Sequence, residues 1–298
     1  MFASFLPSNV TQLTEETSIA LAQAIQRIEV QTPLALSPIA TSYLQVGQGS
    51  RPMLLLHGFD SSVLEFRRLV PCLADQYTLW AVDFLGFGFT DRGLDLDYSP
   101  EAIKTHLYYT WKTVIGHPIV MVGASMGGAV AIDFALTYPE AVHQLVLINS
   151  AGFAQGPDIG KLMVPPIGNV LGYLATEFLR QPGVRRRVSL QAYHDPKLVT
   201  ADAELCAALH LQLPNWNRAL SAFTKSGGYN FLADKIPQIQ VPTLVIWGEH
   251  DRILGTADAQ KFQQAIAHSQ LHWIAQCGHV PHLEKPQETA RAIRQFVP

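Results

Sequence analysis

The sequence predicts a mostly parallel, doubly wound α/β sheet that carries a helical insertion. Short apolar runs recur along the chain, and helical patterns separate several of them, which is typical of alternating strands and helices. One long interval, residues 153–239, interrupts this alternation with helical patterns and no convincing buried strand. These two observations define the fold class.

The first expected element is a helix. The stretch "QLTEETSIALAQAIQRIEV", residues 12–30, places Leu21, Ile25 and Ile28 at helical spacing. Acidic residues stand in its first turn, where the positive end of the helix dipole favours them. We therefore expect residues 1–38 to form a helical extension that packs on the main body, with a contact to a partner or a membrane surface as the alternative.

The runs expected to form the sheet are rich in apolar residues and lack strict alternation, which suits strands buried on both faces of a parallel sheet. They span residues 39–47, 51–58, 77–84, 118–124, 143–150, 241–248 and 269–275. Helical patterns at 61–74, 99–115 and 127–138 lie between some of them. The predicted organisation is a core of residues 39–152 and 240–298 and a helical cap of residues 153–239.

Composition excludes several classes of protein. The chain has 298 residues and a formal net charge of −3, so it lacks the basic character of a nucleic-acid-binding protein. Its cysteines, Cys72, Cys206 and Cys277, are too few and scattered for a disulfide framework or metal cluster. There is no basic, apolar leader at the start and no run of about 18 apolar residues. We expect a cytoplasmic protein without a membrane span.

The stretch "VGASMGGAVAIDFALTYPEAV", residues 122–142, joins a strand pattern to a helical pattern without a spacer. Gly123, Ser125 and Gly127 form a G-x-S-x-G sequence at the junction. Such a turn strains the serine backbone and admits only small neighbours, and it holds the hydroxyl at a helix N-terminus that stabilises negative charge. We interpret Ser125 as a nucleophile; the alternative is an incidental serine in a glycine-rich turn.

A serine hydroxyl needs a neighbouring base that a third group orients. Candidates follow two later apolar strands, in "EHDRILG" after residue 248 and in "QCGHVPHLEKP" after residue 275. With the G-x-S-x-G junction, this order of serine, acid and histidine resembles the α/β-hydrolase fold superfamily. The resemblance covers roughly residues 39–298, and it implies a helical cap after the sixth strand.

The resemblance implies that Ser125 is the nucleophile, Asp251 the acid that orients the histidine, and His279 the general base. Glu249 is a rival acid and His282 a rival base. Asp251 matches the family's G-x-x-D pattern, and His279 directly follows a glycine as in the family's G-H pattern. His282 is therefore expected to be structural.

The oxyanion of an acyl-transfer intermediate needs preorganised hydrogen-bond donors. The resemblance implies the backbone N–H groups of Met126, directly after the nucleophile, and Phe59, in the loop after "LLLHG". His57 is expected to support this loop rather than move protons, and Asp83, in "VDFLGFGFTD", to fix a turn. Neither a cofactor nor a metal ion is implied.

The favoured reaction is hydrolysis of a carboxylic ester through an acyl-enzyme. Haloalkane dehalogenases and epoxide hydrolases use aspartate where this chain has Ser125. Their H-G-x-P loop is also absent from this chain, because Asp60 stands in the position of the proline. C–C bond hydrolases of ring-cleavage products remain an alternative, although their elbow usually has asparagine instead of Ala124. Menaquinone-pathway synthases and cofactor-free perhydrolases also resemble the sequence. The non-enzyme alternative is a ligand-binding receptor of this fold, which would turn over its ligand very slowly.

The cap is expected to hold a small, apolar ester. Its large apolar side chains either line an acyl pocket or pack the cap; they include Phe153, Met163, Tyr173, Phe178, Trp216, Phe223 and Tyr229. Arg185, Arg186 and Arg187 either recognise an anion or form a solvated face. The stretch "KSGGYNF", residues 225–231, loosely resembles hydrolases of chloroplasts and photosynthetic bacteria, some relatives of which cut the phytyl ester of chlorophylls. Phytyl-ester hydrolysis is therefore a further alternative.

Overall fold

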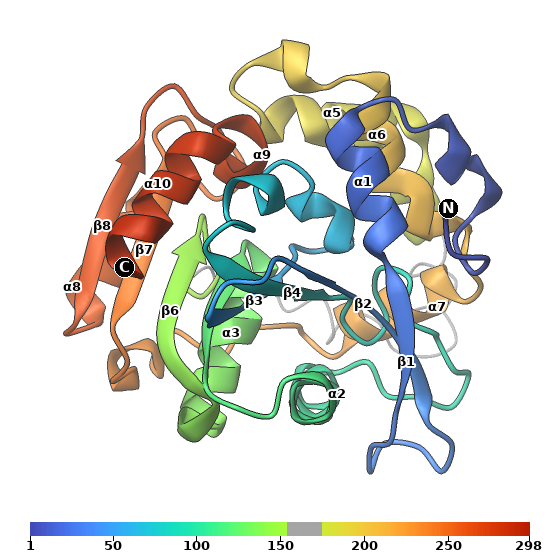
Figure 1. Ribbon diagram of the computed structural model, residues 1–298, viewed down its shortest axis with the longest axis horizontal. Coiled ribbons are helices and arrows are strands. Elements are labelled where there is room, and N and C mark those ends of the chain that lie inside the picture. Colours follow the sequence, from blue (N-terminus) through green and yellow to red (C-terminus); the bar gives the residue numbers. More distant parts are fainter. Residues whose placement is uncertain (154–174) are drawn as a thin grey trace.

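The computed structural model of the protein describes residues 1–153 and 175–298 (Figure 1). Within these residues, eight strands form one sheet in the order β1-β2-β4-β3-β5-β6-β7-β8. Their bounds are β1 Gln26–Val30, β2 Ile39–Val46, β3 Arg51–Leu56, β4 Tyr77–Val82, β5 Ile119–Ala124, β6 Val142–Ile148, β7 Thr243–Gly248 and β8 Ser269–Ile274. β2 is antiparallel to both of its neighbours, β1 and β4, whereas the pairs from β4 through β3, β5, β6 and β7 to β8 are parallel, so the sheet is mostly parallel as predicted.

Both faces of the parallel strands are covered, which explains their continuous apolar sequences. Along β3, Met53 and Leu55 pack into one buried cluster, and Leu54 and Leu56 pack into the other. The helices α2 Pro100–Val114, α3 Met126–Thr137 and α8 Ala257–Ala265 contribute to one cluster. α1 Glu16–Ala24 and α10 Pro286–Phe296 contribute to the other. Helices on both faces make the sheet doubly wound, as the sequence predicts.

Two predicted helices are wrong. The helix expected across residues 12–30 ends at Ala24, and residues 26–30 form β1, which pairs with β2 from Gln26 opposite Tyr43 to Val30 opposite Ile39. This pairing supplies backbone partners that helical periodicity cannot reveal. In place of the helix expected across 61–74, only the short 3-10 turns η2 Val63–Phe66 and η3 Val70–Cys72 form. Pro71 lacks the N–H that a continuous helix needs there.

The described residues between β6 and β7 are helical. They include α5 Pro182–Ala192, η6 Pro196–Leu198, α6 Ala201–Ala208, η7 Leu209–Gln212, α7 Trp216–Lys225 and η8 Ile236–Gln238. α5 and α6 lie beside α1, on the opposite side of the sheet from α2 and α3 (Figure 1). This is the predicted insertion after the sixth strand. Residues 154–174 of the expected cap lie outside the described residues, so its limits at 153 and 239 remain a prediction.

The N-terminal segment is fastened to the cap. The Asp202 carboxylate on α6 accepts hydrogen bonds from the Glu15 N–H at 2.9 Å and the Ser18 hydroxyl at 2.5 Å. Arg68 of the core in turn forms an ion pair with Glu15 at 2.6 Å. The segment therefore packs on the main body, as expected, although it contributes a strand as well as a helix.

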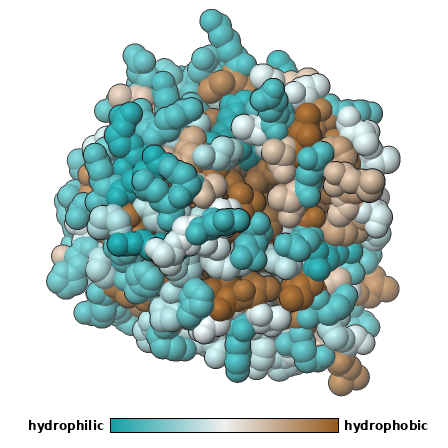
Figure 2. All heavy atoms as spheres, viewed as in Figure 1, coloured by the Kyte–Doolittle hydropathy of each residue, from teal (hydrophilic) through white to brown (hydrophobic). Residues whose placement is uncertain are grey.

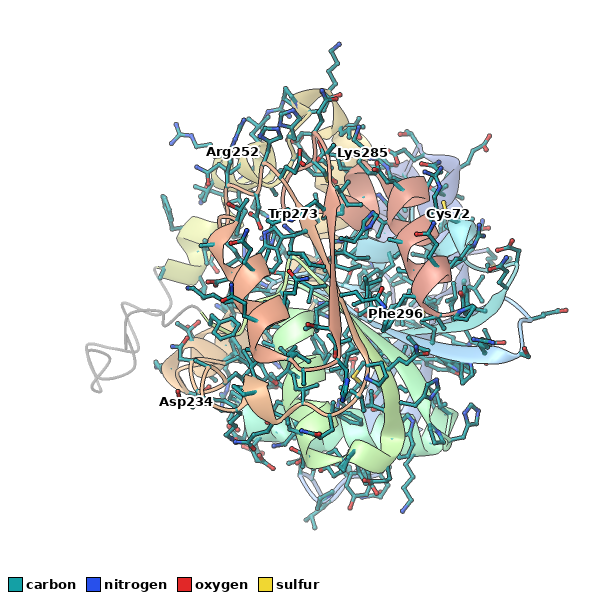
Figure 3. The ribbon with its side chains drawn as sticks, turned by 90° about the vertical axis from the view of Figure 1, so that its left-hand side faces the viewer. Cys72, Asp234, Arg252, Trp273, Lys285 and Phe296 are labelled. Carbon is teal, nitrogen blue, oxygen red and sulfur yellow. The ribbon has the colours of Figure 1, made fainter. Side chains whose placement is uncertain are left out.

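The surface seen in the same view is largely hydrophilic, with smaller apolar patches between (Figure 2). Figure 3 looks toward the β8 edge of the sheet, where Trp273 of β8 and Phe296 of α10 lie. Among the helices of the described residues, none has both the length and the apolar character to cross a membrane.

Candidate active site

Ser125 stands between the end of β5 and the start of α3, at the tip of the sheet. Its φ of 52° lies in the left-handed region, which side chains other than glycine rarely adopt. The Ser125 N–H donates to the Ile148 carbonyl at 3.0 Å, and the Ser125 carbonyl accepts from the N–H groups of Gly128 and Ala151. These bonds hold the strained turn that the G-x-S-x-G sequence predicts.

The glycines around Ser125 are required by close backbone packing. A Cβ added at Gly123 would lie 2.3 Å from the Gly127 carbonyl oxygen, and one at Gly127 would lie 2.0 Å from the Leu56 carbonyl oxygen. Both distances are far below van der Waals contact with backbone that cannot move aside. The crowding read from the sequence is therefore contact between β3, β5 and α3.

The structure brings the three predicted catalytic side chains together. His279 Nε2 lies 3.0 Å from Ser125 Oγ, and His279 Nδ1 lies 2.9 Å from Asp251 Oδ2. Because an ionised Asp251 can only accept, the proton of the histidine belongs on Nδ1, which leaves Nε2 free to accept the serine proton. This is the geometry that nucleophilic catalysis by serine requires.

Asp251 is held as an acceptor by several donors. Its Oδ1 accepts from the N–H groups of Ile253 and Leu254, and its Oδ2 also accepts from the Asn149 amide at 2.7 Å. Burial raises the pKa of Asp251, but the contacts with His279, Asn149 and the Leu254 N–H bring it below its ordinary value. The carboxylate therefore stays charged where the histidine needs it.

Asn149 is a contributor that sequence reasoning missed. It follows β6, is buried, and its side-chain oxygen also accepts from the Gly248 N–H at 3.1 Å. The asparagine thus links the end of β6 to the acid loop after β7. Its sequence signal is a single amide residue after an apolar strand, which is too common to single out.

The loop of His279 is packed against the cap. The His279 N–H donates to the Ala192 carbonyl at the end of α5, at 2.6 Å. A Cβ at Gly278 would lie 2.2 Å from the same carbonyl oxygen. Glu284, which sequence reasoning also missed, accepts from the N–H groups of Gly278 and Asp195 and so joins this loop to the cap.

The rival residues lie apart from the hydroxyl of Ser125. Glu249 and His250 are exposed, and the ring of His250 stacks on His194 at 4.2 Å between centroids. His282 is buried, with its Nε2 3.0 Å from Glu65 Oε1. Arg252, beside Asp251, is exposed at the surface (Figure 3). The structural interpretation of His282 is the one that its surroundings support.

The loop with the expected oxyanion donors runs beside Ser125. Gly58, Phe59 and Ser125 line one cavity, and Met126 begins α3 directly after the serine. The Gly58 N–H donates to Glu65 Oε2 at 2.9 Å, which fixes the loop from the core side. Within residues 1–153 and 175–298, no acceptor for the Phe59 N–H is found.

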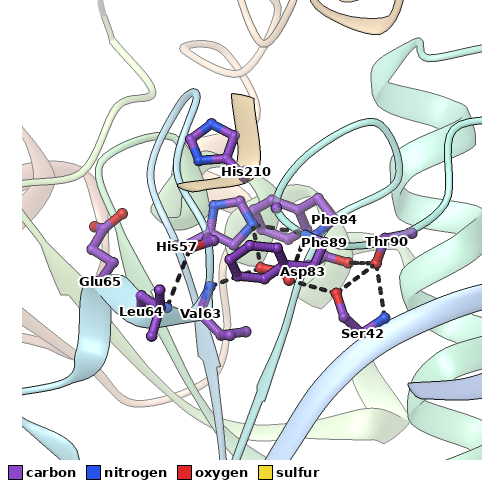
Figure 4. Close-up of polar contacts among 12 residues, drawn as sticks. Ser42, His57, Val63, Leu64, Glu65, Asp83, Phe84, Phe89, Thr90 and His210 are labelled. Carbon is purple, nitrogen blue, oxygen red and sulfur yellow. Dashed lines mark hydrogen bonds and ion pairs between the residues drawn. The ribbon is translucent and has the colours of Figure 1, made fainter. Parts of the chain in front are cut away.

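His57 and Asp83 have the supporting roles expected of them (Figure 4). His57 is fully buried, and its Nε2 accepts from the Phe84 N–H at 3.3 Å. The Asp83 carboxylate accepts from the Val63 N–H at 2.7 Å and the Phe89 N–H at 2.8 Å. Asp83 thus fixes the turn after β4 and ties it to the start of η2.

A cavity of about 300 Å³ lies between the core and the cap and contains Ser125 and His279. Most of its lining is apolar or small: Gly58, Phe59, Leu64, Leu179, Val184, Val188, Ala192, Ala203, Cys206, Ala207, Ile253, Val280 and Leu283. Cap helices α5 and α6 supply a large share of this wall. Ser125 therefore faces a space bounded by both the core and the cap.

Of the large cap side chains that were candidates for the pocket wall, the five that the structure describes are not among the residues lining this cavity. Trp216, Phe223 and Tyr229 are buried in the packing of the cap on the core. Phe178 is exposed, and Phe153 packs on the ring of Phe262. Packing is thus the role of Trp216, Phe223, Tyr229 and Phe153 but not of the exposed Phe178, while Met163 and Tyr173 lie outside the described residues.

The three consecutive arginines of α5 differ from one another. Arg185 is half-buried and forms an ion pair with Asp60 at 2.7 Å. Arg186 pairs with Glu204 at 2.5 Å, and Arg187 is exposed. Arg186 and Arg187 are solvent-exposed, whereas Arg185 lies in the cavity wall, so the expected solvated face covers only two of the three arginines. In the part of the chain that the structure describes, no cluster of histidine, cysteine or acidic side chains could hold a metal ion.

A family model described as "alpha/beta hydrolase fold" matches residues 51–286. The match covers most of the chain and includes Ser125, Asp251 and His279 within its limits. Together with the sheet and the site geometry, it shows that the chain belongs to the α/β hydrolase fold family and is a hydrolase.

Among curated proteins, the chain is 35% identical to the alpha/beta hydrolase domain-containing protein VTE7 of Arabidopsis thaliana, over 99% of this chain and 90% of that protein. It is 29% identical to a 2-hydroxy-6-oxo-6-(2'-aminophenyl)hexa-2,4-dienoic acid hydrolase of Metapseudomonas resinovorans, over 87% and 88%. Among solved structures, a serine hydrolase involved in carbazole degradation, the CarC enzyme, is 26% identical with a TM-score of 0.72, over 92% and 99%. These relatives agree on hydrolysis but not on one substrate.

Proposed function

We propose that this protein hydrolyses carboxylic esters with an apolar acyl or alcohol group, using Ser125, His279 and Asp251. The observation that supports this proposal best is the continuous hydrogen-bonded series from Asp251 through His279 to Ser125, which opens into a largely apolar cavity. Lipases stand among the curated relatives, including Lipase 1 of Psychrobacter immobilis, 28% identical over 82% of this chain.

In the proposed mechanism, His279 Nε2 takes the proton of Ser125 as the hydroxyl oxygen attacks the ester carbonyl. The N–H groups of Phe59 and Met126 stabilise the tetrahedral oxyanion, and Asp251 stabilises the charged imidazole. His279 then protonates the leaving alcohol, and an acyl-enzyme remains on Ser125. A water molecule, activated by the same histidine, releases the acid and restores the serine.

Cleavage of a carbon–carbon bond is the second candidate, because the Metapseudomonas relative is a dienoic acid hydrolase by name. Two residues distinguish the candidates in this chain. Ala124 precedes the nucleophile, and Asp60 stands in the loop where C–C hydrolases are richer in glycine. We therefore favour the ester.

The test is an activity screen of the full-length protein. The panel contains p-nitrophenyl esters from acetate to decanoate, a phytyl ester and a ring-cleavage product. Repeated turnover of apolar esters is expected. Faster turnover of the ring-cleavage product would favour the C–C hydrolase, and tight binding of a ligand with no turnover would contradict the enzyme mechanism.

A further inference from the structure

Asp60 lies at the junction of the oxyanion loop and the cap. It directly follows Phe59, and its φ of 49° places its backbone in the left-handed region. Aspartate tolerates this region better than most residues, but the surroundings must hold it there. Only 9% of its side chain is exposed. An acidic side chain so placed needs partners, because burying an unpaired charge is costly.

Those partners come from three separate elements of the cap. Arg185 of α5 donates to Asp60 Oδ2 at 2.7 Å. Trp216 of α7 donates its indole N–H to Asp60 Oδ1 at 2.8 Å, and His210 Nε2 of η7 lies 3.1 Å from the same oxygen. These partners are 125 to 156 residues away in the chain. The carboxylate is thus the point where α5, η7 and α7 meet the core.

Asp60 is ionised, and an ionised carboxylate suits its three hydrogen-bond donors. Burial raises the pKa of Asp60, but the hydrogen bond from His210 and the contacts with Arg185 lower it to about 2. Burial lowers the pKa of His210, and its Nδ1 has no hydrogen-bond partner among the described residues. A neutral ring with its proton on Nε2 satisfies both facts. An ionised carboxylate accepts at both oxygens, whereas asparagine would turn an NH₂ group toward at least one donor.

The loop is held on both sides of Phe59. Glu65 fixes Gly58 from the core, and the cap fixes Asp60. The ring of Phe59 also packs on Phe223 of α7, 6.0 Å between centroids. These contacts therefore restrain the direction of the Phe59 N–H group. The contact on the Gly58 side comes from the core, and the contacts of Asp60 and of the Phe59 ring come from the cap.

We propose that Asp60 is a positioning residue, through which the seated cap sets the position of the oxyanion donor at Phe59. In this role Asp60 makes no contact with the reacting atoms of the substrate or with the hydroxyl of Ser125. Its effect passes through the backbone to Phe59, so it is expected in the transition state and not in ground-state binding. This inference rests on the proposed ester hydrolysis.

The experiment compares Asp60→Asn with Asp202→Asn in the full-length protein, with active sites counted by phosphonate titration. Asp202 is also a buried carboxylate that fastens the cap, but its partners belong to the N-terminal segment. For Asp60→Asn we expect kcat to fall about 10- to 100-fold, up to the loss of one oxyanion donor, with KM changed less than about threefold. Asp202→Asn should lower the melting temperature and leave kcat per titrated site within about twofold.

A trifluoromethyl ketone supplies a readout that a merely structural role would not move. The serine oxygen adds to its carbonyl and forms a hemiketal whose oxyanion occupies the oxyanion hole. Asp60→Asn should therefore weaken the binding of this ketone about as much as it lowers kcat. Equal kcat and equal ketone affinity in folded Asp60→Asn would overturn the inference. If Asp60→Asn does not fold, Trp216→Phe removes a single donor to Asp60 and should lower kcat about three- to tenfold. An unchanged kcat in Trp216→Phe would also overturn the inference.

Hydrogen exchange separates this inference from the proposed function. Amides of residues 57–62 should exchange faster in Asp60→Asn than in wild type, and Asp202→Asn should not show this change. The measurement needs no ester. If the wild type hydrolyses no ester, the proposed function fails, while unchanged exchange in the loop would refute the coupling itself.

Discussion

The core and the cap hold their functional residues by different means. In the core, the backbone turn between β5 and α3 positions Ser125, and glycines make that turn possible. In the cap, helices that line the cavity are fixed by side-chain contacts with distant residues, such as Arg185 with Asp60 and Asp202 with Glu15. The difference indicates that local backbone geometry places the nucleophile, whereas the cavity wall and the loop of Phe59 and Asp60 depend on contacts between distant residues. The predictions below test this division.

Removal of the nucleophile should have the largest effect. Ser125→Ala should lower kcat by about 10⁶-fold, as in serine hydrolases that lose this residue, and abolish labelling by a serine-directed phosphonate. Peptide mass spectrometry of the labelled wild type locates the adduct. Ser150→Ala, a buried neighbour of the turn, is the control and should keep labelling. An adduct on another serine would disprove the assignment.

Loss of the acid should come next. Asp251→Asn should lower kcat by roughly 10⁴-fold with the fold intact, because an amide favours the wrong tautomer of His279. Steady-state kinetics and circular dichroism test both points. The matched control is Glu249→Gln in the same loop, which is exposed and should change kcat less than twofold. The reverse result would mean that the wrong carboxylate was chosen.

Changes in the cavity wall should alter selectivity and spare the chemistry. Each buried methylene contributes about 0.8 kcal/mol, so kcat/KM should rise up to roughly fourfold per carbon, reach a maximum at medium-chain esters and then fall. Ala203→Leu on α6 fills part of the cavity and should move the maximum to shorter chains, with acetate turnover within about threefold. A flat profile in the wild type would argue against an apolar pocket.

The smallest effect concerns acid stability. The folded pKa of Asp60 is about 2 against 3.8 in an ordinary carboxyl, so its contribution is present above about pH 4 and is lost as pH falls toward 2. The shift corresponds to roughly 2 kcal/mol. Urea unfolding at several pH values should show a shallower acid loss for Asp60→Asn. Asp234→Asn, which changes an exposed carboxyl, should retain the wild-type slope (Figure 3).

Local signals were sufficient for the central sheet and the serine turn. The apolar runs predict the parallel strands because burial on both faces requires apolar residues at consecutive positions. The G-x-S-x-G junction predicts the strained turn because only small residues fit between β5 and α3. Phe59, Asp251 and His279 follow from motifs that stand at the ends of strands.

Other features depend on residues far apart in the chain. Residues 26–30 form a strand because β2 offers its backbone edge, and no local period reports that edge. Asn149 matters because Asp251 lies 102 residues later and yet within 2.7 Å. In the sequence, Asp60 is only a departure from the H-G-x-P pattern. Its role becomes apparent in the structure, where Arg185, His210 and Trp216 surround its carboxylate. The sequence by itself determined the nucleophile turn and the apolar strands of the parallel part of the sheet, since both arise from neighbours in sequence. Only the tertiary structure decided the partners of the buried carboxylates, because desolvation and hydrogen bonding act through space between segments that the sequence keeps apart.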